Sequence, residues 1–153
     1  MSITISLFPA QEIPQSANRP EVKRLAVLLA SGTDEQVFSD CLVSVQSYEN
    51  WQIWVQCLEP GPQALSGGLR VLANEVVPRL SVPDRLVIAL DANAQLPMEA
   101  QAYLRRLFQA KVPVVVVAKS WPGFLDDLAL EPGQSLERVE PNALEDYLAA
   151  WLE

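Results

Sequence analysis

The chain contains no histidine among its 153 residues and only two cysteines. Histidine is the commonest general base and the commonest metal ligand in proteins, so its absence excludes every catalytic triad that depends on an imidazole. Cys41 and Cys57 are too few for a disulfide framework and, without histidine, do not make a zinc site. We expect both thiols to be small buried hydrophobic side chains in a reducing compartment.

Basic residues and long apolar segments are also scarce. Lysine and arginine number 11 against 19 aspartates and glutamates, which gives a net charge of -8. Nucleic acids and anionic membranes are bound by clustered lysine and arginine, so this balance argues against both as partners. No segment approaches the roughly 20 apolar residues that span a bilayer, and none resembles a signal peptide. We therefore expect a cytoplasmic protein without membrane insertion.

Composition and proline placement divide the chain into two parts. Half of the residues are hydrophobic and 20% are charged, which is typical of a globular domain. Residues 2–8 alternate apolar and polar side chains, as a half-buried strand does, and prolines interrupt residues 9–23. We predict an N-terminal strand or arm with a proline-containing linker over 1–24, and a single α/β domain over 25–153.

Strand and helix patterns alternate from Leu25 onward. Continuous apolar runs at 25–30, 84–92 and 112–120 predict strands buried on both faces, the aromatic and β-branched residues of 51–58 predict another strand, and 135–139 predicts a weaker one. The predicted strands are thus 25–30, 51–58, 84–92, 112–120 and 135–139. The predicted helices begin after Thr33, span 61–80, begin at Pro97, and begin after Asn142, which caps the last helix. Short connections between such elements give parallel pairing with right-handed crossovers. The sequence thus predicts a three-layer sandwich, with a five-stranded, mostly parallel, doubly wound sheet and helices on both faces.

Ligands of such sheets bind beyond the carboxyl ends of the strands. Ser31, Gly32 and Thr33 follow the first predicted strand there, and with Asp34 they offer a turn into a helix that a phosphate group would fit. The alternative is a plain helix cap, in which Thr33 begins a capping box, and we favour it. Lys119 and Ser120 follow the fourth predicted strand.

Asp91 and Asn93 are the candidate residues for a metal and diphosphate. A carboxylate and an amide oxygen two residues apart suit Mg²⁺ or Mn²⁺. An aspartate at a strand end also serves as an ordinary turn residue, and we favour that interpretation. We accordingly predict no catalytic residue, no metal site and no bound cofactor.

Aromatic side chains mark two candidate partner surfaces. Trp121 and Phe124 lie in a loop beyond the fourth predicted strand, while Tyr147 and Trp151 lie on the last predicted helix. Exposed aromatic residues anchor protein interfaces when they are not tucked against the core. For the loop that carries Trp121 and Phe124, we weigh an exposed interface and burial in the core equally.

Two blocks of the chain carry a resemblance to a known family. CLVSVQSYENWQIWV resembles the opening block of the family-two glycosyltransferases, which have the GT-A fold. DRLVIALDANAQLPMEAQAYLRRL is similar to their second block, an apolar strand ending in Asp-x-Asp. The resemblance implies a nucleotide-sugar fold whose acids hold the base, the metal and the sugar diphosphate. Here Gln56 and Cys57 stand where the first acids belong, and Asn93 replaces the second acid of the metal motif.

The later half of the chain is also similar to response-regulator receiver domains. That resemblance places Asp91 or Asn93 near the phosphorylated position. Ala118 would stand at the usual serine or threonine, and Glu140 at the expected lysine. It implies a pseudo-receiver that binds partners through its faces.

Both resemblances imply a scaffold without its active-site acids. We therefore predict a non-catalytic interaction or regulatory domain, which binds a protein partner through Trp121, Phe124, Tyr147 and Trp151. One alternative is a nucleotide-sugar-binding protein or glycosyltransferase-like enzyme, which would use Ser31–Asp34 with Asp91 and Asn93. Another is a structural subunit or assembly factor.

Overall fold

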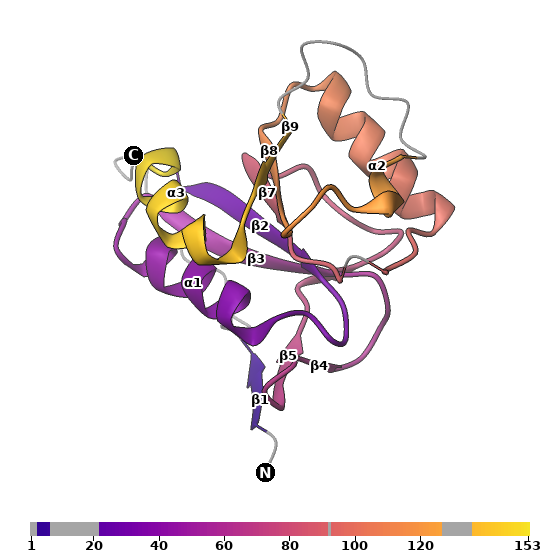
Figure 1. Ribbon diagram of the computed structural model, residues 1–153, viewed down its shortest axis with the longest axis horizontal. Helices are drawn as coiled ribbons and strands as arrows, with labels where there is room; N and C mark the ends of the chain where they lie inside the picture. The colour runs from indigo at the N-terminus through magenta and orange to yellow at the C-terminus, as the bar shows by residue number, and fades with distance from the viewer. Residues whose placement is uncertain (1–2, 7–21, 92, 127–135) are drawn as a thin grey trace.

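A six-stranded sheet runs through the middle of the computed structural model, which describes residues 3–6, 22–91, 93–126 and 136–153 (Figure 1). Its strand order is β6-β3-β2-β7-β8-β9, and every neighbouring pair is parallel. The bounds are β2 Lys23–Leu29, β3 Trp51–Cys57, β6 Glu75–Val76, β7 Arg85–Ile88, β8 Val114–Val117 and β9 Leu136–Val139. The predicted parallel sheet is confirmed, with β6 as an additional edge strand.

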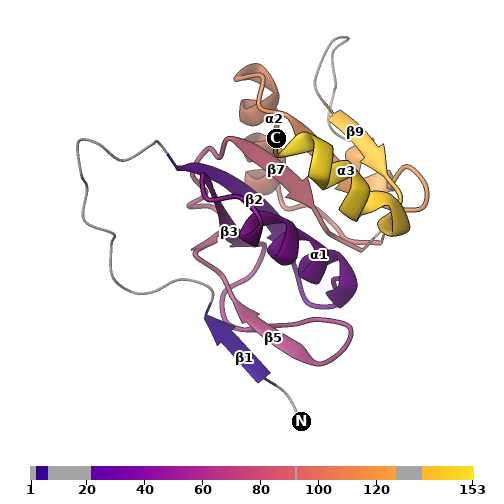
Figure 2. The same cartoon turned by 90° about the vertical axis from the view of Figure 1, so that its left-hand side faces the viewer.

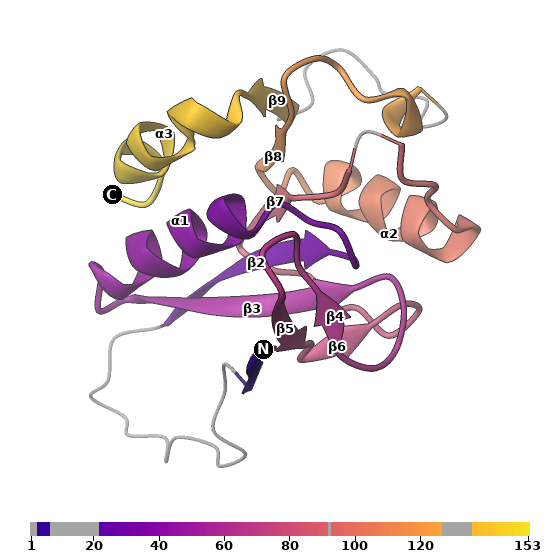
Figure 3. The same ribbon diagram turned by 60° about the horizontal axis from the view of Figure 1, so that its bottom comes forward.

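Helices cover both faces of this sheet, as predicted. They are α1 Glu35–Gln46, α2 Met98–Gln109 and α3 Leu144–Trp151, with short 3₁₀ turns η1 Gly123–Leu125 and η2 Pro141–Ala143. α1 and α3 pack side by side on one face, and α2 lies on the other (Figure 3). Among the described residues no helix is long and apolar enough to cross a membrane.

Two hydrophobic cores lie on either side of the sheet, and β2 contributes to both. Successive side chains of a strand point to opposite faces. Leu25, Val27 and Leu29 therefore pack against α1 and α3, while Ala26 and Leu28 pack against α2, and all five are fully buried. The unbroken apolar run that predicted this strand is thus explained by burial on both faces.

Residues 61–80 form strands and turns, so the helix predicted there is wrong. The segment holds β4 Gln63–Ala64, β5 Leu69–Leu72 and β6. β4 and β5 pair antiparallel around a turn in which Gly68 has a φ of +95°. Glycine adopts this left-handed conformation without the steric cost that other residues meet. Gly67-Gly68 therefore makes a hairpin turn rather than a weak point within a helix.

The N-terminal strand belongs to a second, smaller sheet. β1 Ile3–Ser6 pairs in parallel with β5, which gives the order β1-β5-β4 (Figure 2). The strand pattern in residues 2–8 therefore corresponds to an element outside the six-stranded sheet. Most of the predicted proline-containing linker lies outside the described residues, at 7–21.

The caps of two helices differ from those predicted. The carboxylate of Asp34, not the hydroxyl of Thr33, caps α1 by accepting a hydrogen bond of 2.9 Å from the Gln36 backbone N–H. α3 begins at Leu144, directly after the η2 turn, and has no side-chain cap, so Asn142 does not serve there. Thr33 and Asp34 are both good capping residues, and sequence patterns locate the start of a helix only to within one or two residues.

Candidate functional site

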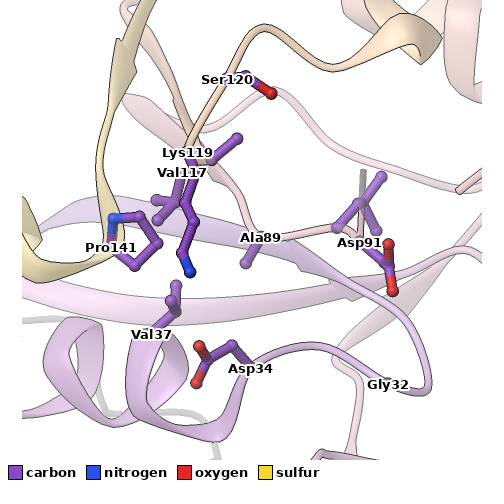
Figure 4. Close-up of a pocket in the computed structure, with 11 residues that line it drawn as sticks. Gly32, Asp34, Val37, Ala89, Asp91, Val117, Lys119, Ser120 and Pro141 are labelled. Atoms are coloured by element: carbon purple, nitrogen blue, oxygen red, sulfur yellow. The ribbon is translucent and has the colours of Figure 1, made fainter. Parts of the chain in front are cut away.

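A cavity of about 480 Å³ lies beyond the carboxyl ends of β2, β7 and β8 (Figure 4). The chain leaves β2 toward β3 on one side, and it leaves β7 toward β8 on the other. This reversal is the topological switch point, where open α/β sheets bind their ligands. α1 closes one wall with Val37, and the η2 turn closes another with Pro141.

Three charged side chains line this switch-point pocket. Lys119 follows β8, and its amine points into the cavity toward Val37 (Figure 4). Asp34 lies at the start of α1, and Asp91 lies beyond β7. Within the described part of the chain, Lys119 forms no ion pair with either carboxylate. Its ammonium group therefore has no carboxylate partner there, while one oxygen each of Asp34 and Asp91 already accepts a backbone N–H.

The predicted residues Asp91 and Asn93 form a tight turn. The Asn93 backbone N–H donates to Asp91 Oδ1 at 2.9 Å, and the Ala94 N–H donates to the Asp91 carbonyl at 2.9 Å. Such a bond to an aspartate side chain two residues back is an Asx turn. Asp91 lines the pocket and Asn93 does not. Over the described residues, no three histidine, cysteine, aspartate or glutamate side chains gather closely enough to hold a metal ion.

The hydroxyl groups predicted for a phosphate are bound to the protein itself. Thr33 is 2% exposed, and its hydroxyl donates to the Ala89 carbonyl at 2.7 Å while accepting from the Ala30 N–H at 3.1 Å. Ser31 donates from its backbone N–H and its hydroxyl to Gln63 Oε1, each at 3.0 Å. Of the predicted trio only Gly32, with a φ of +92°, lines the pocket.

Gln63 organises the loop beside the pocket, a role that no sequence pattern indicates. Its side chain is buried, and its amide donates to the carbonyls of Glu59 at 3.2 Å and Gly61 at 3.0 Å. Its oxygen receives both bonds from Ser31. Burying a polar amide is tolerated because its groups are hydrogen-bonded. Residues 61–80 were predicted to be a helix, and a single glutamine in a helix does not indicate hydrogen bonds to a distant loop.

Both cysteines lie in the core and away from the pocket. Cys41 packs from α1 and Cys57 from β3, and both are free thiols. Burial raises the pKa of each to about 12, and the neighbouring Asp40 adds to the shift at Cys41. Thiol nucleophiles and metal ligands act as thiolates, so these side chains are inert packing residues, as the sequence predicts.

The four aromatic residues predicted to bind a partner do not share one surface. Trp121 is 46% exposed and directly follows the pocket residue Ser120, whereas Phe124 is 6% exposed and packs in the core beneath α2. Tyr147 and Trp151 are half-buried on α3, with ring centroids 5.5 Å apart.

Tyr147 and Trp151 are engaged within the molecule. The Tyr147 hydroxyl donates to Glu137 of β9 at 3.1 Å. The Arg85 guanidinium lies 5.3 Å from the Trp151 ring and 5.3 Å from the Trp51 ring. Arg85 and Trp51 begin β7 and β3, so this aromatic cluster lies at the amino ends of the strands. Trp121 follows the carboxyl end of β8 and so lies at the opposite ends of the strands.

The parallel sheet, its two helical layers and the pocket at the switch point define a doubly wound α/β protein. No family model matches the chain, and no curated protein sequence matches it. Its fold is that of the DJ-1/ThiJ/PfpI-like proteins, because solved structures of that group share it. They include DJ-1 of Toxoplasma gondii, with a TM-score of 0.66, 12% identity, and coverage of 86% of this chain and 90% of that one.

Two further structures support the same fold. Drosophila melanogaster DJ-1beta has a TM-score of 0.65 and 12% identity, with 83% of this chain and 87% of that one covered. An AraC family transcriptional regulator from Pseudomonas putida has a TM-score of 0.61 and 17% identity, with 85% and 89% covered.

These neighbours overturn both resemblances found in the sequence. Most of these similar structures are of DJ-1 or DJ-1/ThiJ/PfpI-like proteins, so the glycosyltransferase-like and pseudo-receiver interpretations are wrong. The sequence pattern that this chain shares with those two families is a buried strand, an amphipathic helix and a second buried strand. Any doubly wound sheet repeats that pattern because parallel strands covered on both faces must be apolar. The resemblance therefore reflected the architecture and not the family.

Proposed function

We propose that this chain is a non-catalytic regulatory domain that binds a small molecule in the switch-point pocket. The observation that carries the proposal is the chemistry of the pocket wall. It offers the amine of Lys119, the carboxylates of Asp34 and Asp91 and the hydroxyl of Ser120, all on an otherwise apolar lining. Binding sites of this kind are mostly apolar, with a few polar groups that fix orientation.

The pocket lacks the paired groups that covalent catalysis needs. A serine nucleophile requires a base within about 3 Å of its hydroxyl. In the described part of the chain, Ser120 forms no hydrogen bond with Lys119 or with either carboxylate. Cys41 and Cys57 lie in the core, and the chain has no histidine.

One of the structural neighbours favours a regulatory role. The Pseudomonas putida protein of this fold is an AraC family transcriptional regulator. The scaffold therefore occurs in a protein named for regulation. A domain that binds a ligand and transmits that event to a partner needs a pocket and an exposed surface beside it. Here Ser120 lines the pocket and Trp121 follows it at the surface.

Thermal denaturation in the presence of a broad set of metabolites tests the pocket. A ligand that binds only the folded state stabilises it by RT ln(1 + [L]/Kd). We expect at least one compound to raise the Tm of the native chain, and we expect the Lys119→Gln variant to lose that rise. Lys111→Gln is the matched control, because Lys111 is exposed and does not line the pocket. Stabilisation that survives Lys119→Gln would contradict the assignment.

A protein partner bound through Trp121 is the second candidate function, and the exposure of that side chain favours it. Trp121 is 46% exposed, and exposed tryptophans are frequent interface anchors. We expect Trp121→Ala to lose a partner in affinity capture from the native host. Val43→Ala is the control, since Val43 is 54% exposed on α1. Equal capture by both variants would remove Trp121 from the interface.

A further inference from the structure

The β4–β5 hairpin holds the β2–α1 loop, which forms part of the wall of the switch-point pocket. Gly32 and Asp34 of this loop line the cavity. The Gly32 backbone N–H donates to the Ala64 carbonyl at 2.9 Å, and the Ser66 N–H donates to the Thr33 carbonyl at 3.0 Å. These bonds attach the backbone of the pocket wall to the backbone of the hairpin.

Side chains add further bonds at both ends of the loop. Ser31 donates from its N–H and its hydroxyl to Gln63 Oε1, each at 3.0 Å. At the start of α1, the Glu35 N–H donates to the Ser66 hydroxyl oxygen at 3.0 Å, and the Glu35 carboxylate accepts from the Leu69 N–H at 2.9 Å. Each hydrogen bond contributes about 1 kcal/mol net. The position of the pocket wall therefore depends on the hairpin.

The N-terminal strand β1 occupies the other edge of the hairpin. In the small sheet, β5 has β4 on one side and β1 on the other, with Ile3–Ser6 opposite Leu69–Leu72 (Figure 2). A hairpin of two strands is at best marginally stable in water, and a third strand adds to its stability. β1 is therefore the element that completes the sheet on which the pocket wall depends.

β5 carries the contact with β1 and the contact with α1 on adjacent residues. Leu69 directs its N–H to Glu35 and its C=O to the Leu65 N–H, both away from β1. Backbone groups alternate in direction along a paired strand, so the N–H of Arg70 faces β1, where Thr4 lies opposite. A change at the β1 edge of β5 therefore acts one residue from the bond that holds Glu35.

β1 can leave β5 and remain attached to the chain. It has four residues, and β5 is the one described strand with which it pairs. Residues 7–22 connect β1 to β2, and a chain can extend by roughly 3.3 Å per residue, which gives this connection a reach of several tens of Å. Short elements with few partners open more readily than core strands.

We propose that the outer edge of β5 is a strand-docking site, through which residues 3–6 control the switch-point pocket. With β1 docked, the three-stranded sheet holds Gly32 and Glu35 in place. With β1 released, the remaining hairpin opens more often, and the β2–α1 loop loses its support. Docking of β1 and binding of a ligand in the pocket therefore strengthen each other. The inference rests on the proposed ligand-binding function and adds its regulation.

Hydrogen exchange followed by NMR tests the coupling without a ligand. Deletion of residues 1–8 removes β1, and a Thr4→Pro, Ile5→Pro variant prevents its pairing at unchanged chain length, because proline has no N–H. We expect the amides of Arg70, Gly32 and Glu35 to exchange about tenfold faster in both variants. Amides of the central strand β8 are the control, and we expect their exchange to be unchanged.

Two results would overturn the coupling. Faster exchange at Arg70 with unchanged exchange at Gly32 and Glu35 would show that β1 leaves without affecting the pocket wall. Equal acceleration in β8, or loss of the fold in both variants, would show general destabilisation instead of an effect confined to the hairpin.

A peptide with the sequence of residues 1–8 provides the converse test. We expect it to restore slow exchange at Gly32 and Glu35 when it is added to the truncated chain at millimolar concentration, which is about the effective concentration that a flexible tether supplies. A peptide of the same composition in scrambled order is the control. Equal effects of the two peptides would contradict a specific docking site on β5.

Ligand affinity separates this inference from the proposed function. For a compound that stabilises the full chain in a Lys119-dependent manner, we expect at least about fivefold weaker binding to the chain without residues 1–8. Equal affinity would overturn control of the pocket by β1, while the ligand-binding function would stand. If no compound binds the full chain, the proposed function fails, and the exchange of Gly32 and Glu35 still decides whether β1 supports the loop.

Discussion

Gln56 carries a fully buried amide whose hydrogen bonds join α2 to the sheet. Its Oε1 accepts a bond of 2.7 Å from the Tyr103 hydroxyl, and its Nε2 donates to the Ser81 carbonyl at 3.1 Å. Glu75 accepts from the Ser81 hydroxyl at 2.7 Å and completes the network. A buried polar group is costly when it lacks a partner. The network therefore fixes how α2 lies against β3.

Removal of the Tyr103 hydroxyl tests this network. Tyr103→Phe leaves Gln56 Oε1 without its short bond in the core, so we expect the free energy of unfolding to fall by about 1–3 kcal/mol. Urea denaturation measures the change. Tyr147→Phe is the control, because the Tyr147 hydroxyl bonds to an exposed glutamate, Glu137. Similar losses in both variants would contradict a special role for the buried bond.

The two buried thiols predict a stability loss in alkaline solution. Burial raises the pKa of Cys41 and Cys57 from an ordinary 9.0 to about 12, so the folded state holds these protons more tightly than the unfolded state. This contribution is complete below pH 9 and is lost as the pH rises toward 12. We expect the Tm to fall over that range, and less steeply in a Cys41→Ala, Cys57→Ala variant. Identical slopes would contradict the linkage.

Sequence patterns predict residue roles best where burial alone decides them. Cys41 and Cys57 are buried as predicted, because a small apolar side chain on a helix stripe or a strand belongs in the core. The roles of Thr33 and Gln63 depend on partners distant in the sequence. Thr33 bonds to Ala89, and Gln63 bonds to Ser31. A local pattern contains no information about either partner.

At the scale of elements, α1 is tied to the β4–β5 hairpin through Glu35. The Glu35 carboxylate accepts a bond of 2.9 Å from the Leu69 backbone N–H, and the Glu35 backbone N–H donates to the Ser66 hydroxyl oxygen at 3.0 Å. Gly67 leaves the space that this carboxylate occupies. A Cβ at Gly67 would lie 2.5 Å from Glu35 Oε2.

A methyl group at Gly67 should therefore loosen the hairpin. Gly67→Ala displaces the Glu35 carboxylate and breaks its bond to Leu69, which we expect to reduce the free energy of unfolding by about 1 kcal/mol. Gly123→Ala is the control, because a Cβ there meets no atom within 4 Å. Chemical denaturation gives the stability, and hydrogen exchange of the Leu69 amide reports the local change. Unaltered exchange at Leu69 would contradict the displacement.

Elements with one clear periodicity were predicted well from the sequence. The runs that became β2, β7 and β8 are mostly continuous and apolar, because both faces of each strand are covered, whereas β9 carries the exposed Glu137 and Arg138 and was predicted as a weaker strand. Residues 61–80 carry mixed apolar and polar side chains that fit a helix as well as short strands. Only their pairing with β1 and β3 decides between the two. Pairing is a tertiary property that overrides local propensity.

At the scale of the whole molecule, the net charge of -8 predicts a partner preference. Nucleic acid binding depends on neutralising phosphates with lysine and arginine. We expect fluorescence polarisation to show no binding of labelled duplex DNA or single-stranded RNA at about 0.15 M salt, where screening acts over about 8 Å. A basic protein of similar size serves as the positive control. Salt-sensitive binding would contradict this expectation.

The sheet topology determines the position of the site, and the sequence therefore predicts its location better than its chemistry. Parallel strands bring their carboxyl ends to one edge, so Asp91, Lys119 and Gly32 were expected near one another. Their side-chain directions were not predictable. Asp34 and Lys119 reach the pocket, while Ser31 and Thr33 turn back into the protein. Those directions follow from loop conformations that depend on contacts across the sheet.

The pocket is built from both hydrophobic layers at once. Val37 and Val117 belong to the core beneath α1 and α3, whereas Leu90 belongs to the core beneath α2. A molecule that contacts all three side chains becomes a shared constituent of two packing units separated by the sheet. Its binding would therefore slow local opening in both layers together. One small ligand would then add a second link, besides the sheet itself, between the packing on its two faces.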